Sequence, residues 1–301
     1  MGLKQILRKY LPQPSANTAA AFQRNEQAHQ MLQKRNCILT LDYHVVEHCN
    51  LNCKCCSTYA PLAQKEFTDI EVFKADLQRL QELVGDRLLN LHLLGGEPLL
   101  HPDIEQFVVE ARRIFPEIYI DVVSNGLLTK KMPDSFWNTL KEQNVVFQLS
   151  SYPINLDYQE MMAYVRSKGV RTFSYGGGER IATFTRKALD PFGQQVMYAS
   201  HIKCPMVNST QMRKGKLYRC PTAAYVCNLN RRIKEVDPEA PEETFRLHSL
   251  DALDVHKAQS ADEVFEFLSN PTPFCRYCAV STMQDVPWEN SKRDIREWVD
   301  L

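Results

Sequence analysis

The sequence has no excess of charge of one sign and no long apolar run. Its 36 basic residues are balanced by 36 acidic ones, and no dense basic run is present. We therefore expect no nucleic-acid partner. The longest apolar runs are far too short to span a bilayer, which predicts no membrane partner. Residues 1–14 are mildly basic and lack the continuous apolar stretch of a signal peptide, so we expect a cytoplasmic protein.

The sequence also lacks internal repeats and low-complexity tracts, and instead alternates between strand and helix patterns. The predicted strands are residues 38–46, 88–94, 118–123, 145–149 and 170–175. The predicted helices are residues 70–84, 102–115, 135–142 and 157–168. Near-continuous apolar strands separated by helices predict an α/β fold with a parallel sheet, open or curled into a barrel. In such folds the chemistry gathers at the carboxyl ends of the strands.

The alternation breaks near residue 195. Residues 212–220 favour a hairpin that turns at Lys214-Gly215, residues 236–243 an acidic surface loop, and residues 261–268 and 290–299 two short helices. We therefore predict an N-terminal helical extension over residues 1–36, a core domain over 37–198 and a smaller domain over 199–301.

Ten cysteines in a reducing compartment favour metal binding or redox chemistry over disulfides. Cys49, Cys53 and Cys56 form a C-x3-C-x2-C run directly after the first predicted strand. Such a run can wrap three thiolates around a cubane iron–sulfur cluster and leave the fourth iron open to a small molecule. A zinc site that uses His48 or His44 as its fourth ligand is the alternative.

Small and polar residues mark the ends of the next three predicted strands. Gly95-Gly96-Glu97-Pro98 ends the second strand, Ser124-Asn125-Gly126 the third and Ser150-Ser151 the fourth. Gly95 and Gly96 have no Cβ, so the backbone there can come close to a ligand. Ordinary turn chemistry accounts for these residues equally well when each is taken alone.

The cysteine run after the first strand and the Gly-Gly-Glu segment after the second together resemble the radical S-adenosylmethionine (SAM) superfamily, over residues ~38–200. The resemblance implies a partial (β/α)6 TIM-barrel core. It also implies that Cys49, Cys53 and Cys56 ligate a [4Fe–4S] cluster whose open iron chelates SAM. One electron, from a donor such as flavodoxin or ferredoxin, would then cleave SAM to a 5′-deoxyadenosyl radical.

The same resemblance assigns roles at the strand ends. The Gly95-Gly96-Glu97 segment would bind the methionine ammonium, with Glu97 as its charged partner. Ser124, Asn125 and Ser150 would meet the methionine carboxylate and the ribose hydroxyls. Cys55 stands where the superfamily commonly has an aromatic residue, which leaves the adenine contact without its usual side chain.

A second cysteine set resembles the twitch module, a short form of the SPASM auxiliary-cluster domain. It comprises Cys204, Cys220, Cys275 and Cys278, with Gly215 at the hairpin between the first two. This resemblance implies a second, auxiliary [4Fe–4S] cluster ligated by all four cysteines. A structural zinc ribbon is the alternative.

The resemblance implies an oxidoreductase or epimerase that abstracts hydrogen from a small hydroxylated substrate, such as a sugar or glycan precursor. Cys227 is the candidate hydrogen-atom donor of an epimerase, or else an inert buried thiol. We expect His92 to pack inside the barrel rather than act in catalysis. Two alternatives stay open: a peptide-modifying maturase of the SPASM type, and a non-catalytic zinc or iron–sulfur protein.

Overall fold

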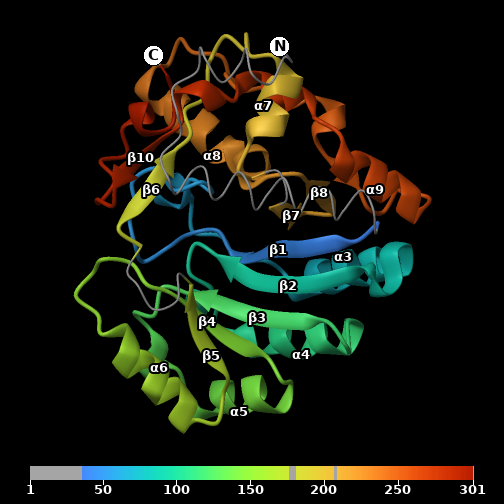
Figure 1. Ribbon diagram of the computed structural model, residues 1–301, viewed down its shortest axis with the longest axis vertical. Coiled ribbons are helices and arrows are strands. Elements are labelled where there is room, and N and C mark those ends of the chain that lie inside the picture. The colour runs from blue at the N-terminus through green and yellow to red at the C-terminus, as the bar shows by residue number, and fades with distance from the viewer. Residues whose placement is uncertain (1–35, 176–180, 207–208, 301) are drawn as a thin grey trace, which may run out of the picture.

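The computed structural model describes residues 36–175, 181–206 and 209–300. An eight-stranded sheet with the order β5-β4-β3-β2-β1-β7-β8-β9 runs through the molecule (Figure 1). Its strands are β1 (Ile38–Val46), β2 (Leu88–Gly95), β3 (Tyr119–Ser124), β4 (Val146–Ser150), β5 (Thr172–Tyr175), β7 (Thr210–Arg213), β8 (Lys216–Tyr218) and β9 (Leu253–Asp254). The helices are α3 (Ile70–Val84), α4 (Ile104–Ile114), α5 (Asp134–Glu142), α6 (Tyr158–Ser167), α7 (Met197–Lys203), α8 (Pro221–Val236) and α9 (Ala261–Ser269).

The six strands from β5 to β7 are parallel, which confirms the predicted α/β fold and is consistent with a partial barrel. The sixth parallel strand does not follow β5 along the sheet. It is β7, which joins the opposite edge beside β1. The strand that does follow β5 in the chain, β6 (Thr183–Arg186), is short and polar and pairs instead with β10 (Gln284–Pro287).

The main apolar core lies between one face of the sheet and helices α3 to α6 and α9. Leu41, Leu91 and Val122 come from adjacent strands and are fully buried against residues such as Phe73 and Phe107. Side chains alternate between the faces of a strand. The residues between these apolar ones, among them Asp42, His92 and Asp121, therefore face the opposite side.

The first predicted helix, over residues 70–84, is confirmed as α3. The carboxylate of Asp69 accepts hydrogen bonds from the N–H groups of Glu71 and Val72 at the start of α3. Gly85, with φ of 60°, follows its last residue. The predicted hairpin is also present, with Lys214 and Gly215 both at positive φ between β7 and β8.

Two predictions after residue 195 differ from the structure. Residues 290–299 are not a helix but an irregular segment with one 3-10 turn at Ile295–Glu297. Sixteen residues form α8, which the sequence interpretation missed. The N-terminal helical extension predicted over residues 1–36 lies almost wholly outside the described residues.

The predicted core and C-terminal regions share structure. β7 pairs with β1, and Tyr59 and Leu62 join a second apolar core with Tyr225, Phe274 and Trp298. The domain boundary near residue 198 stays a prediction. In the described part of the chain, no helix is long and apolar enough to cross a membrane.

Candidate functional site

The first cysteine loop, residues 47–59, follows β1 at the carboxyl end of the parallel strands. Burial raises the pKa of Cys53 to about 12, and the charge of Cys56 adds to the rise. Burial likewise raises the pKa of Cys49, and the negative charges of the Cys53 and Cys56 thiolates raise it further. The three thiols thus share one low-dielectric environment. A bound metal would favour their deprotonation there.

Cys55 is set apart from this trio. Its backbone is left-handed, with φ of 60°, and its side chain is 3% exposed. Its thiol donates to the carbonyl oxygen of Glu297 at 3.3 Å. Cys55 therefore faces the C-terminal segment of the chain.

The end of β2 packs directly on the first cysteine loop. The N–H of Gly96 donates to the oxygen of Val46 at 3.0 Å, and that of Glu97 to the oxygen of His48 at 3.1 Å. A Cβ on Gly95 would lie 2.0 Å from the Val46 oxygen, and one on Gly96 2.1 Å from the His48 oxygen. The two glycines are thus required for a backbone-to-backbone contact that places the loop, while their predicted contact with SAM stays a prediction.

Glu97 joins the ends of β2 and β3. Its carboxylate, 1% exposed, accepts from the Ser124 hydroxyl at 2.7 Å, the Asn125 N–H at 2.9 Å and the Leu99 N–H at 3.2 Å. Burial raises the pKa of Glu97 to about 7, against the effect of these hydrogen bonds. The carboxylate is occupied by three internal donors, and its predicted pairing with the methionine ammonium stays a prediction.

Asn125 reaches the cysteine loop itself. Its amide donates to Oδ1 of Asn50 at 2.7 Å and lies 3.8 Å from Sγ of Cys49. Ser150 ends β4 and hydrogen-bonds the Tyr152 hydroxyl, whose pKa is raised by burial and by the cysteine trio. Tyr152 therefore borders the trio, a position that the sequence did not indicate.

A C-terminal strap, residues 284–298, covers the loop. The Trp288 indole donates to Sγ of Cys53 at 3.3 Å, and the Trp298 indole donates to the Cys56 oxygen at 2.9 Å. Backbone hydrogen bonds join Lys54 to Glu289 and Ser291 to Asn52. The sequence interpretation missed the strap because it assigned a helix to residues 290–299.

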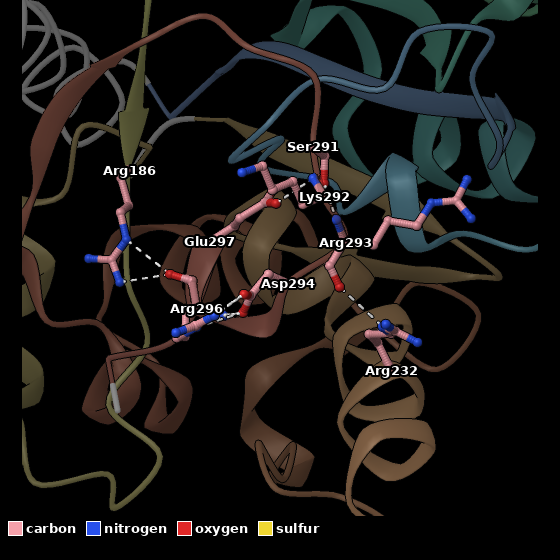
Figure 2. Close-up of polar contacts among 8 residues, drawn as sticks. All are labelled: Arg186, Arg232, Ser291, Lys292, Arg293, Asp294, Arg296 and Glu297. Atoms are coloured by element: carbon pink, nitrogen blue, oxygen red, sulfur yellow. Dashed lines mark hydrogen bonds and ion pairs between the residues drawn. The ribbon is translucent and has the colours of Figure 1, made fainter.

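Two arginines from other elements hold the strap. Figure 2 shows the carbonyl of Arg293 directed at Arg232 of α8, at 3.1 Å from Nε. Arg186 of β6 donates through Nε and Nη2 to the carbonyl of Arg296, at 3.2 and 3.0 Å. The strap is therefore tied both to the loop and to the C-terminal core.

The second cysteine set is brought together from three segments. Cys204 ends α7, Cys220 precedes α8, and Cys275 and Cys278 lie in and after the 3-10 turn Pro273–Tyr277. Burial raises the pKa of Cys278 well above its ordinary value, and the other three cysteines add to the rise. The four thiols therefore share one buried environment.

Two cations stand beside this second set. Burial lowers the pKa of Lys187. The negative charges of nearby thiolates act in the opposite direction and raise it; these are Cys204, Cys220, Cys278 and Cys56. Burial lowers the pKa of Arg219 to about 10, again against the fields of the cysteines. Cysteines of both sets thus act electrostatically on Lys187.

Among the residues that the structure describes, no three or more His, Cys, Asp or Glu side chains form a group that could hold a single metal ion. For both cysteine sets, the iron–sulfur cluster and the alternative of zinc stay predictions.

Cys227 lies on α8 and is exposed, so the alternative of a buried, inert thiol does not hold. Its Sγ lies 3.9 Å from the Tyr225 oxygen. Its predicted role as a hydrogen-atom donor stays a prediction.

Residues 43–158 match the family described as the Radical SAM superfamily. The matched part of the chain, from within β1 to the start of α6, is therefore a domain of this superfamily. Such a domain implies a [4Fe–4S] cluster and SAM as cofactors. That Cys49, Cys53 and Cys56 are the three ligands stays a prediction.

Curated relatives match over a limited part of the chain. GTP 3′,8-cyclase of Helicobacter pylori is 29% identical over 104 residues, 34% of this chain and 32% of the relative. PqqA peptide cyclase of Gluconobacter oxydans is 31% identical over 91 residues, 30% of this chain and 24% of the relative. The match thus spans a third or less of the length of these relatives.

Similar solved structures are more distant. SuiB of Streptococcus suis, bound to SAM, is 18% identical, with a TM-score of 0.37 over 50% of this chain and 37% of that one. BtrN, in complex with AdoMet and 2-DOIA, is 13% identical, with a TM-score of 0.44 over 80% of this chain and 92% of that one. TM-scores this low assign no function.

Proposed function

We infer that this protein reductively cleaves SAM and abstracts a hydrogen atom from a small polar substrate. One observation carries the inference: three strand ends are hydrogen-bonded to one another around the cysteine trio. Asn125 binds Asn50 in the loop, Glu97 binds Ser124, and Gly96 binds Val46. A cofactor held by the trio would sit over the carboxyl ends of the parallel strands, where such folds carry their chemistry.

When bound there, a [4Fe–4S] cluster and SAM supply the one-electron cleavage of a sulfonium and a carbon radical that abstracts hydrogen. Cys49, Cys53 and Cys56 would hold three of the four irons. Trp288 donates a hydrogen bond to a ligand sulfur, and Asn125 fixes the loop at Cys49. The strap covers the loop and excludes water from its buried side.

We propose that Cys204, Cys220, Cys275 and Cys278 hold an auxiliary [4Fe–4S] cluster, as in twitch-type domains. Four thiolates around a cluster core of charge +2 leave a net charge of about −2, which Lys187 and Arg219 would neutralise. Those two cations are buried beside thiols that would otherwise be neutral. A flavodoxin- or ferredoxin-type donor would supply the electrons.

The products distinguish dehydrogenation of the substrate from its epimerisation. A dehydrogenase gives a ketone two hydrogens lighter than the substrate, whereas an epimerase returns a hydrogen to the opposite face. If Cys227 is the donor, turnover in deuterated solvent labels the product at one carbon, and Cys227→Ala stops turnover. An unlabelled ketone excludes the epimerase.

Peptide modification is the second candidate. It is supported by the similarity to a peptide cyclase at 31% identity, although that match covers 30% of this chain.

The test is an anaerobic assay of the reconstituted protein with dithionite and SAM. Release of 5′-deoxyadenosine by the wild-type protein, and its loss in Cys53→Ala, supports the proposed function. Cys37→Ala is the matched control, because it removes a thiol that precedes β1 and lies outside both cysteine sets, so cleavage of SAM is expected to persist. No release from protein that carries its full iron content contradicts the proposed function.

A further inference from the structure

Four polar residues lie side by side on the face of the sheet opposite the main core. Gln211 of β7 is in register with Asp42 of β1, Asp42 with His92 of β2, and His92 with Asp121 of β3. Their apolar neighbours, such as Leu41, Leu91 and Met212, all point into the core on the other side. We call these four residues the polar row.

Some polar atoms of the row already have hydrogen-bond or ion-pair partners within the protein. Asp42 accepts from Nε2 of Gln211 at 2.6 Å and from the Ser209 hydroxyl at 3.1 Å, and it pairs with Nδ1 of His92 at 3.1 Å. The other ring nitrogen of His92 lies 3.8 Å from Oδ1 of Asp121. His92 is therefore held between two carboxylates on the face of the sheet away from the helices.

The remaining acceptors are left open. Both carboxylate oxygens of Asp121 are buried without a hydrogen-bond partner, and so is Oε1 of Gln211. Asp121 is 0% exposed and Gln211 1% exposed. An unpaired buried acceptor costs about 1–3 kcal/mol, so a purely structural network would not be expected to keep three of them. These oxygens are placed to accept from another molecule.

The position of the row suits a substrate. His92 and Asp121 each lie three residues before the ends of their strands, a span of about 10 Å. The strand ends carry Glu97 and Asn125 beside the cysteine trio. A quarter of the His92 side chain is exposed, whereas Asp121 and Gln211 are buried, so a molecule would reach the row at His92. A small molecule seated on the row would reach toward the proposed cofactor site.

The charge of the row selects the kind of molecule. Two carboxylates face one imidazole, so the row is acidic even when His92 is protonated, and its open atoms are all acceptors. It would bind ammonium and hydroxyl donors and repel phosphate or carboxylate groups.

We propose that the polar row is the substrate-recognition site and binds a small polyhydroxylated amine, with its ammonium on Asp121 and a hydroxyl beside His92. This deepens the proposed function and rests on it. Asp121 sets specificity, while Asp42, Gln211 and Ser209 hold His92 in place.

The experiment compares three sugars with the same type of ring and different charge. Reconstituted, SAM-loaded protein is titrated by calorimetry at neutral pH with glucosamine, glucose and glucuronate. Glucosamine is expected to bind at least about tenfold more tightly than glucuronate, with glucose between them, because a charged hydrogen bond contributes about 1.5–3 kcal/mol. Equal binding of the three, or binding of none, overturns the proposal, and this arm needs no variant.

The variant arm uses Asp121→Asn, which has nearly the same shape and removes the negative charge that faces His92. It is expected to abolish the preference for glucosamine, whereas Asp262→Asn on the surface of α9 retains it. An unchanged preference in Asp121→Asn overturns the proposal. Release of 5′-deoxyadenosine is measured on the same wild-type preparation. Its absence contradicts the proposed function, whereas release without an amine preference contradicts the polar row alone.

Discussion

The indole N–H of Trp288 donates to Sγ of Cys53 at 3.3 Å, across 235 residues of sequence. Hydrogen bonds to ligand sulfur stabilise the reduced, more negative form of an iron–sulfur cluster and raise its reduction potential. Trp288→Phe keeps the ring and removes the donor. We predict a more negative midpoint potential for the first cluster, measured by redox titration followed by electron paramagnetic resonance.

Trp298→Phe is the matched control for this prediction. Its indole binds the carbonyl oxygen of Cys56 rather than a sulfur atom. We expect it to loosen the strap and leave the potential close to that of the wild-type protein. An unchanged potential in Trp288→Phe, or an equal shift in both variants, contradicts the assigned role of Trp288.

Cys55 gives a prediction about metal content. Its thiol binds the Glu297 carbonyl, so Cys55→Ala should retain the full iron content and lower the unfolding free energy by about 1 kcal/mol. Cys53→Ala should lose the first cluster. Iron analysis and thermal unfolding check both outcomes. Loss of iron in Cys55→Ala would identify it as a ligand and contradict its placement.

Gly96→Ala tests the contact between β2 and the cysteine loop. The new Cβ would lie 2.1 Å from the His48 oxygen, and neither backbone can move without displacing Cys49. We predict a loss of about 3 kcal/mol or more, seen in thermal unfolding, together with poor cluster assembly. Gly85→Ala meets no atom within 4 Å and carries only the strain of φ 60°, so about 1 kcal/mol is expected there. Equal losses in the two variants would show that the close contact has no effect of its own.

The pH dependence of stability follows from Asp121. Burial raises its pKa from 3.8 to about 6 in the folded protein, against the charge of His92. Between these values the folded chain holds a proton that the unfolded chain has lost. The unfolding free energy therefore falls as pH rises through this window, by about 3 kcal/mol at most.

Asp121→Asn should flatten that part of the profile. The contribution of Glu97, whose pKa is also raised by burial, remains in both proteins. The measurement is the thermal unfolding midpoint between pH 4 and 7. A variant whose stability falls as steeply as that of the wild-type protein rules out the assignment to Asp121.

The second cysteine set predicts the iron count. Two cubanes give about eight irons per chain, and Cys220→Ala should reduce this to about four while SAM cleavage by the first cluster persists. Iron and sulfide analysis with Mössbauer spectroscopy checks this. About four irons in the wild-type protein, or zinc in place of the second cluster, contradicts the auxiliary cluster and leaves the first site untouched.

Much of the fold could be predicted because its signals are local. Asp69 and Gly85 mark the two ends of α3, and the apolar runs of β1 to β5 indicate buried strands. The cysteine trio and the strand ends were also visible, since parallel strands bring their carboxyl ends to one edge. What each residue does there was less predictable: Glu97 faces Ser124, and Gly96 faces His48.

The rest depends on contacts between distant residues. The strap was mistaken for a helix because its fold is set by the cysteine loop and by Arg186 and Arg232, not by its own periodicity. The polar row needs the pairing of β7 with β1, which no turn or spacing in the sequence indicates. For the same reason His92 was expected to be a packing residue.

The account depends on an open iron that binds SAM beside Asn125 and the cysteine trio. The most direct measurement is the electron paramagnetic resonance spectrum of the reduced, reconstituted Cys220→Ala protein, in which the first cluster alone remains. Addition of SAM is expected to shift the g values of that cluster. A spectrum that SAM leaves unchanged, in protein with a full first cluster, would contradict the account.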